Sequence, residues 1–156
     1  MKDEEYMQLA LMQARIAEKH DEVPIGAVVV CDGKVIAEAG NMKESTNDPA
    51  GHAEFLAMKA AAEHLGAWRL SGCTVYVTLE PCIMCAGLMH QARIDRCVYG
   101  ASDQKAGALG TLYAINEDER LNHTFNVSSG VCKEECANLL SNFFSRKRRK
   151  RKHDQA

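Results

Sequence analysis

The sequence lacks an apolar run long enough to span a bilayer, and residues 1 to 5 do not pair a basic stretch with an apolar one. No membrane partner and no export signal are therefore expected, and a cytoplasmic protein is predicted. Only 3 of the 156 residues are proline, and 46% are hydrophobic against 26% charged, which excludes a disordered chain. The length suits a single domain with its own core.

An even set of cysteines, as a disulfide framework needs, is also lacking, because the chain has 7. A reducing compartment with free or metal-bound thiols is the better interpretation. Five of the seven lie in or beside apolar segments, where small buried thiols normally occur, and are expected in the core. These five are Cys31, Cys73, Cys97, Cys132 and Cys136.

The net charge of −2 hides an uneven distribution of charge. Residues 146 to 152 are all Lys or Arg, whereas residues 1 to 145 hold 12 basic and 20 acidic side chains. Such a basic block seldom folds alone, and its commonest specific use is to meet a polyanion such as nucleic acid. A solubilising terminus and a nuclear address are the alternatives. We predict one catalytic domain over residues 1–145 and a basic tail over 146–156 that continues the last helix.

The hydrophobic periodicity predicts a helix, a hairpin and then alternating helices and strands. Asp32-Gly33 suits the hairpin turn, Gly66 a helix end, and Pro81 the first turn of a helix. The predicted helices and strands are helix 5–19, strands 25–31 and 34–40, helix 52–65, strand 73–79, helix 81–91, strands 96–101 and 124–127, and a helix from 133. This order indicates an α/β fold, a three-layer α/β/α sandwich with a mixed sheet of about five strands.

Two short motifs carry the chemistry: His52-Ala53-Glu54 and, 30 residues after the histidine, Pro81-Cys82-Ile83-Met84-Cys85. They match H-x-E and P-C-x-x-C, a known signature of zinc-dependent nucleobase deaminases. Zinc favours imidazole nitrogen and thiolate sulfur, and three protein ligands leave its fourth tetrahedral position open to water. The motifs therefore predict one Zn²⁺ per chain on His52, Cys82 and Cys85, with Glu54 as the catalytic proton carrier.

Both motifs open predicted helices, where the positive end of the helix dipole favours the thiolate form of cysteine. Two other kinds of site remain open for a C-x-x-C sequence, a thioredoxin-like redox pair and a structural zinc. A structural zinc needs a fourth ligand and leaves Glu54 without a role. The candidates for that ligand are His20, His64, His90, His123 and another cysteine.

With these motifs the chain resembles the cytidine and deoxycytidylate deaminase superfamily and, within it, the bacterial tRNA-specific adenosine deaminases. The resemblance runs from about Tyr6 to Arg149. Its specific segments include 23–28, 76–87 and 139–144. It implies a hydrolytic conversion of adenosine to inosine at the wobble position of a tRNA anticodon. It also implies the tRNA anticodon stem-loop as the RNA partner and a homodimer whose subunits share the RNA groove.

The resemblance further implies a set of substrate-binding residues. Val23 and Pro24 would form a wall for the target base, and Asn41 would hydrogen-bond to the base. The residues implied to line the anticodon-loop groove are Asp103, Lys105, Asn122, His123, Phe143 and Arg146. Without the resemblance, the sequence would predict that Asn41 is an ordinary turn residue and that Phe143 is a core residue.

Two other functions compete with tRNA editing. A deaminase of free guanine in the same superfamily would share the motifs and the size, but it would not need the basic tail. A catalytically silent, zinc-containing RNA-binding subunit would keep the metal for structure, and the intact Glu54 speaks against it.

Overall fold

The computed structural model describes residues 1–155, and its centre is a five-stranded sheet in the order β2-β1-β3-β4-β5. The central strand β3 pairs antiparallel with β1 and parallel with β4. The edge strand β2 is antiparallel to β1, and the edge strand β5 is parallel to β4. The strands are β1 (Gly26–Cys31), β2 (Lys34–Gly40), β3 (Cys73–Leu79), β4 (Arg96–Ala101) and β5 (Asn126–Ser128). The predicted mixed sheet of about five strands is confirmed.

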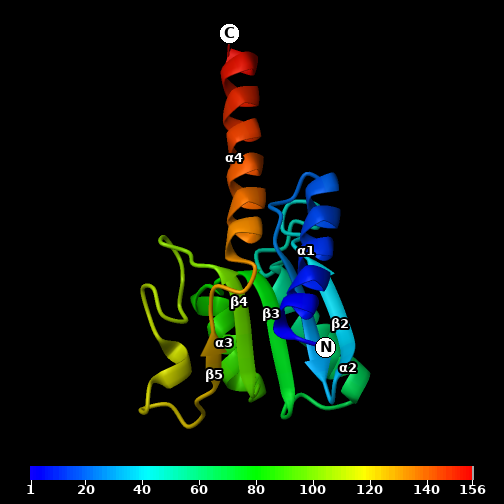
Figure 1. Cartoon of the computed structure of the whole chain (residues 1–156), viewed down its shortest axis with the longest axis vertical. Coiled ribbons are helices and arrows are strands. Elements are labelled where there is room, and N and C mark those ends of the chain that lie inside the picture. The colour runs from blue at the N-terminus through cyan, green and yellow to red at the C-terminus, as the bar shows by residue number, and fades with distance from the viewer. Residues whose placement is uncertain (156) are drawn as a thin grey trace.

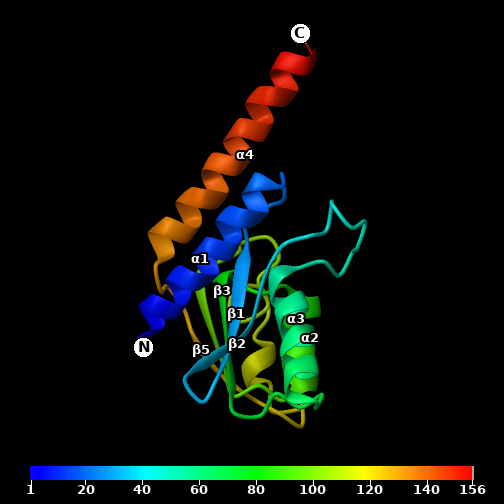
Figure 2. The ribbon, with the colours of Figure 1, turned by 90° about the vertical axis from the view of Figure 1, so that its right-hand side faces the viewer.

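Helices cover both faces of this sheet (Figures 1 and 2). The first and last helices, α1 (Asp3–Lys19) and α4 (Lys133–Gln155), lie on one face. The two middle helices, α2 (Ala53–Leu65) and α3 (Ile83–Ala92), lie on the other. Each interface encloses its own apolar cluster, so the predicted three-layer α/β/α sandwich is confirmed.

The hairpin at the start of the sheet follows directly from its turn residues. Asp32 and Gly33 both have positive φ, 51° and 74°, which is the geometry of the two-residue turns that match strand twist. Cys31 pairs with Lys34 across the turn. The β1 strand is flanked on both sides and covered on both faces, which explains why its sequence is apolar without alternation.

The observed boundaries correct two predictions and add one element that was not predicted. Pro81 precedes the N-cap of α3, which is Cys82, and does not lie in the first turn of the helix. Its carbonyl accepts a hydrogen bond from Ala108 N (2.9 Å), which ties this peptide to a neighbouring loop. The last strand begins at Asn126 instead of 124, and a short 3₁₀ helix, η1 (Ile115–Glu117), lacked any periodic signal in the sequence.

The α4 helix runs well beyond the rest of the molecule at its C-terminal end (Figure 1). Before it leaves the body, it is attached to the end of α1 by two ion pairs. Arg146 pairs with Glu18, and Lys147 Nζ lies 2.5 Å from Asp21 Oδ2. Among residues 1–155 no helix is both long and apolar enough to cross a membrane.

Candidate active site

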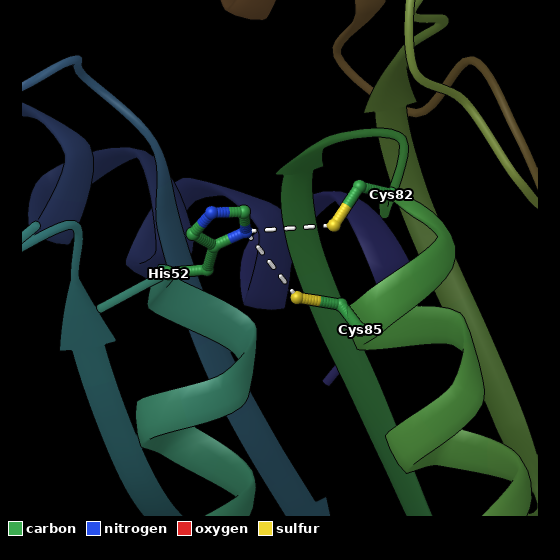
Figure 3. A group of neighbouring side chains, drawn as sticks. All are labelled: His52, Cys82 and Cys85. Atoms are coloured by element: carbon green, nitrogen blue, oxygen red, sulfur yellow. Dashed lines mark hydrogen bonds between the residues drawn. The ribbon is translucent and has the colours of Figure 1, made fainter. Parts of the chain in front are cut away.

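Three side chains converge from the starts of two neighbouring helices. His52 is the N-cap of α2, Cys82 is the N-cap of α3, and Cys85 lies in the first turn of α3. Figure 3 shows the imidazole turned toward both sulfur atoms. The Nδ1 atom of His52 lies 3.6 Å from Sγ of Cys82 and 3.5 Å from Sγ of Cys85. The structure therefore brings the three predicted metal ligands together.

These distances fit a tetrahedral zinc ion. With zinc bonds of about 2.1 Å to nitrogen and 2.3 Å to sulfur, tetrahedral angles place the nitrogen and sulfur roughly 3.6 Å apart. Among residues 1–155 the only group of three or more potential ligands within 4.8 Å of one another is this one, and no fourth histidine or cysteine joins it. A three-ligand set is typical of a catalytic zinc site and not of a structural one.

The two thiols and the imidazole form one hydrogen-bonded unit. Hydrogen bonds from Cys85 and His52 stabilise the Cys82 thiolate and lower the pKa of Cys82 to about 4. The same interaction with Cys82 raises the pKa of Cys85, and the contact with the Cys82 sulfur raises the pKa of His52. Negative charge is thus favoured at the start of α3, where a cation would need it.

Glu54 lies in the first turn of α2, two residues after His52, and is 4% exposed. Burial raises the pKa of its carboxyl to about 7. The carboxyl in turn adds to the effects of Cys82 and burial that raise the pKa of the neighbouring Cys85 thiol. It is not a member of the three-ligand group. A buried carboxyl with a pKa near neutrality, close to a metal site, is able both to accept and to donate a proton.

A cavity of about 250 Å³ opens above the ligand group. One wall comes from the segment before β1 and the loop after β2, and the other comes from the end of β3 and the loop after β4. The lining residues are Glu22, Val23, Ile25, Asn41, Lys43, Glu44, His52, Glu54, Leu79, Glu80, Cys82, Asp103 and Ala106.

Comparison with known proteins places this site in a family. The family model of the MafB19-like deaminases matches residues 1–148. The tRNA-specific adenosine deaminase of Bacillus subtilis (strain 168) is 49% identical over 150 residues, which cover 96% of this chain and 93% of the relative. The chain belongs to the tRNA-specific adenosine deaminase family. The resemblance inferred from the sequence motifs is confirmed.

Two solved structures place this member of the deaminase family among its neighbours. One, from a study of A-to-I editing by tRNA:A34 deaminases at the wobble position of transfer RNA, is 46% identical with a TM-score of 0.84. It covers 87% of this chain and 99% of its own. The other, a guanine deaminase from Bacillus subtilis, is 36% identical with a TM-score of 0.64 and covers 71% of each chain.

Three of the predicted substrate-binding residues of this deaminase line the cavity: Val23, Asn41 and Asp103. The Oδ1 atom of Asn41 accepts a hydrogen bond from Ala53 N (2.8 Å) at the start of α2. The side-chain NH₂ is then the group that Asn41 can offer to a ligand. Asp103 uses Oδ1 to accept hydrogen bonds within its own loop.

The other predicted substrate-binding residues of this deaminase lie outside that cavity. Pro24 is buried beside it, and Lys105 and Asn122 are exposed on loops. His123 Nε2 lies 2.8 Å from the carbonyl of Ile94. The contribution of these residues to an RNA groove remains a prediction from the family.

A second, larger hollow begins where the deaminase cavity ends and leads toward α4. It shares Val23 and Glu44 with the cavity and also touches Phe143, Lys147 and Arg151. Phe143 is only 5% exposed, and the cationic groups of Arg146 and Lys147 lie within 6 Å of its ring centre. The ring thus serves as an apolar support for basic side chains.

Two buried carboxylates in the cavity walls of this deaminase were not predicted. Glu22 and Glu80 are 1% and 2% exposed. Glu22 accepts hydrogen bonds from the backbone N–H groups of Glu44 (3.1 Å) and Ser45 (2.6 Å). Burial opposes the ionisation of Glu22, but hydrogen bonding from the Ser45 side chain and from these two backbone groups outweighs the burial and lowers the pKa of Glu22. The only sequence signal was an acidic residue directly beside an apolar segment, which is too common to mark a site.

The five remaining cysteines are free thiols, as predicted. Cys73, Cys97 and Cys136 are fully buried, which confirms the expectation of core residues for these three. Cys31 and Cys132 are only half-buried, so for them the prediction is partly wrong. Both lie at the margin of an element, Cys31 at the end of β1 and Cys132 just before α4.

Proposed function

We propose that this protein hydrolytically converts adenosine to inosine at the wobble position of a tRNA anticodon. His52, Cys82 and Cys85 would hold one zinc ion, and Glu54 would carry the protons. The proposal depends on one observation: a three-ligand group lies beside a separate buried carboxyl, and His52, Cys82 and Glu54 line the same cavity. The 49% identity to a tRNA-specific adenosine deaminase supports the choice of substrate.

The reaction adds water to C6 of the base and expels ammonia. A zinc ion held by His52, Cys82 and Cys85 would supply Lewis acidity at this site. Glu54 accepts a proton from the incoming water and delivers it to N1 of the ring. A second transfer through the same carboxyl moves the remaining proton of the added hydroxyl to the departing amine, which leaves as ammonia as the C6 carbonyl forms. A pKa of about 7 suits this double role, because neither protonation state is then strongly favoured.

The size of the cavity suits a single base. Its volume of about 250 Å³ lies just below the range of pockets that enclose drug-sized ligands, so a base would enter without its neighbours. A target base within an RNA loop must therefore leave the stack. Val23 and Pro24 would form the wall beside it, and the NH₂ group of Asn41 would donate a hydrogen bond to it.

The RNA around that base would be held by residues at the edge of the cavity and beyond it. We assign Asp103, Lys105, Phe143 and Arg146 to the anticodon loop on the side of α4. Asn122 and His123 precede β5, outside both the cavity and the hollow leading to α4, and would reach RNA bound mainly by a second subunit. A homodimer is therefore part of the proposal. Sedimentation at working concentration tests it, and a fully active monomer would contradict it.

The cytoplasm is the proposed location, because tRNA is found there and all seven cysteines are free thiols.

The function is tested by offering the purified zinc-loaded protein three substrates: tRNA, free guanine and cytidine. We expect ammonia release with tRNA, and inosine at anticodon position one on sequencing. The 36% identity to a guanine deaminase favours guanine as the second candidate. Ammonia from guanine without any inosine in tRNA would replace the first proposal with the second.

A further inference from the structure

A buried carboxylate outside the metal group organises one wall of the cavity. Glu80 follows the last residue of β3 and accepts four hydrogen bonds, all from the loop of residues 102–111. Oε1 accepts from Asp103 N (3.1 Å) and from the hydroxyl of Thr111. Oε2 accepts from Leu109 N and Thr111 N, each at 3.1 Å. Both oxygens are thus saturated by one segment of the chain.

The loop wraps closely around this carboxylate. A Cβ atom at Gly107 would stand only 2.4 Å from the carboxyl carbon of Glu80, so no larger residue fits there without displacing the contact. One residue later, Ala108 N donates to the carbonyl of Pro81 (2.9 Å), next to the ligand Cys82. The loop is therefore fixed against the same turn that carries a metal ligand.

This loop lacks a strand or an α-helix to hold it, yet it supplies Asp103 and Ala106 to the cavity lining. If this loop became ordered only when substrate entered, the loss of its conformational entropy would weaken substrate binding. We propose that Glu80 is a positioning residue that keeps the 102–111 loop ordered before substrate arrives, as a ready-made wall for the target base. The part of this inference that concerns the base rests on the function proposed above.

The other wall provides a matched control. Glu22 is equally buried and anchors the loop after β2 through Glu44 N and Ser45 N. Each of the two carboxylates thus accepts backbone hydrogen bonds from one loop, and each loop belongs to a different wall of the cavity. Substitution of each should loosen its own loop and leave the other unchanged.

The experiment compares Glu80→Gln, Gly107→Ala and Glu22→Gln in the zinc-loaded full chain by amide hydrogen exchange. A glutamine at position 80 would turn NH₂ donors toward backbone N–H donors, and an alanine at 107 would push the loop away. In both variants we expect exchange at Leu109 and Thr111 to rise about tenfold or more. In Glu22→Gln the rise should occur at residues 44 and 45 and not at 109 and 111.

A double-mutant cycle makes the assignment specific. Glu80→Gln and Gly107→Ala act on one contact, so their combined effect on exchange should be clearly smaller than the sum of the two. If Glu80→Gln does not fold, Gly107→Ala and Thr111→Val, which removes only the hydroxyl donor, give the same readout. Unchanged loop exchange, or a rise spread equally over β1 and α2, would overturn the proposal.

Kinetics on an anticodon stem-loop then separate positioning from general damage. We expect Glu80→Gln to raise KM about tenfold while kcat changes less than about threefold and zinc stays at one per chain. Equal losses in kcat and zinc content would mean that Glu80 supports the metal site instead, and would contradict the proposal. The exchange measurement needs no substrate, so a wild-type protein that does not deaminate RNA would refute the proposed function without deciding the role of Glu80.

Discussion

The ligand group and the basic end of α4 hold their functional side chains in opposite ways. His52, Cys82 and Cys85 come from two helix starts and meet within 4.8 Å of one another. The basic residues 146–152 follow one another along a single helix and are mostly exposed. A reaction at one atom needs a few groups at fixed distances, whereas attraction to phosphates accumulates over many loosely placed charges. Substitutions in the ligand group should therefore impair the reaction, whereas substitutions in the basic helix end should weaken RNA binding.

The largest effect is expected from removal of a ligand. Cys82→Ala or Cys85→Ala leaves two protein ligands, so we expect the purified protein to lose most of its zinc, all detectable turnover and part of its thermal stability. Elemental analysis, ammonia release and thermal unfolding measure the three losses. Cys31→Ser is the control, since Cys31 lies outside the ligand group and the variant should keep its zinc. Full activity in a zinc-free Cys85→Ala protein would contradict the proposed metal site.

The next effect separates proton transfer from metal binding. Glu54→Gln keeps the shape of the side chain but cannot exchange a proton, so single-turnover deamination should fall by about 10²- to 10⁴-fold. Zinc content should stay at one per chain, because Glu54 is not in the ligand group. A variant that loses zinc together with its activity would show that Glu54 acts through the metal site.

The basic helix end should show a graded loss of affinity and no loss of chemistry. Replacement of residues 148–152 by glutamine removes five cations and keeps the two that pair with Glu18 and Asp21. If each contacts one phosphate, the slope of log K against log salt should decrease by about 0.7 to 0.9 per contact. The single-turnover rate with saturating RNA should be unchanged. Binding measured from 50 to 300 mM salt is the test, and an unchanged slope would exclude phosphate contacts for this segment.

The smallest effect is expected where neither region is touched. Asp3 accepts hydrogen bonds from both terminal nitrogens of the Arg96 guanidinium, at 3.0 and 2.7 Å, and from the Tyr76 hydroxyl. The Arg96 guanidinium, aided by the Tyr76 hydroxyl, holds the pKa of Asp3 below its ordinary value of 3.8 against the opposing effect of burial. Asp3→Asn should lower the free energy of unfolding by about 1 kcal/mol at pH 7.

The lowered pKa of Asp3 also fixes the pH at which this stabilisation disappears. It should be complete above pH 3.8 and be lost as the pH falls through the lower pKa of the folded state. The difference between wild type and Asp3→Asn in denaturant titrations at pH 7 and pH 3 measures it, and isolates it from metal release by acid. Catalysis at pH 7 should be unaffected, and a difference in stability that is as large at pH 3 as at pH 7 would contradict this assignment.

The sequence predicted the helices, the strands and the grouping of His52, Cys82 and Cys85 well, because each rests on a signal within a few residues. The Asp32-Gly33 turn, the Gly66 helix end and the two ligand motifs are all local patterns. Pro81 was predicted in the first turn of a helix, but it lies just before the N-cap of α3. Its carbonyl accepts a hydrogen bond from Ala108, 27 residues further on, and such a contact leaves no local pattern.

The walls of the cavity could not be predicted for the same reason. Glu22 and Glu80 matter through backbone N–H groups 22 to 31 residues away, and a backbone group carries no sequence signature. Phe143 shows the opposite case. Its helical spacing marked it as core, and it is buried, but the family resemblance was needed to connect it with RNA.

The separation between ligands on helix starts and walls on loops bears on how such a protein can change over evolutionary time. Insertions or replacements in residues 43–47 or 104–106 would reshape what enters the cavity. They would spare Asn41 and Ala108, which bond next to His52 and Cys82, and so leave the geometry of the ligand group intact. A shared scaffold can in this way serve unrelated ligands. The likeness of this chain to a guanine deaminase, with a TM-score of 0.64, fits this kind of change, in which the loops diverge and the scaffold is kept.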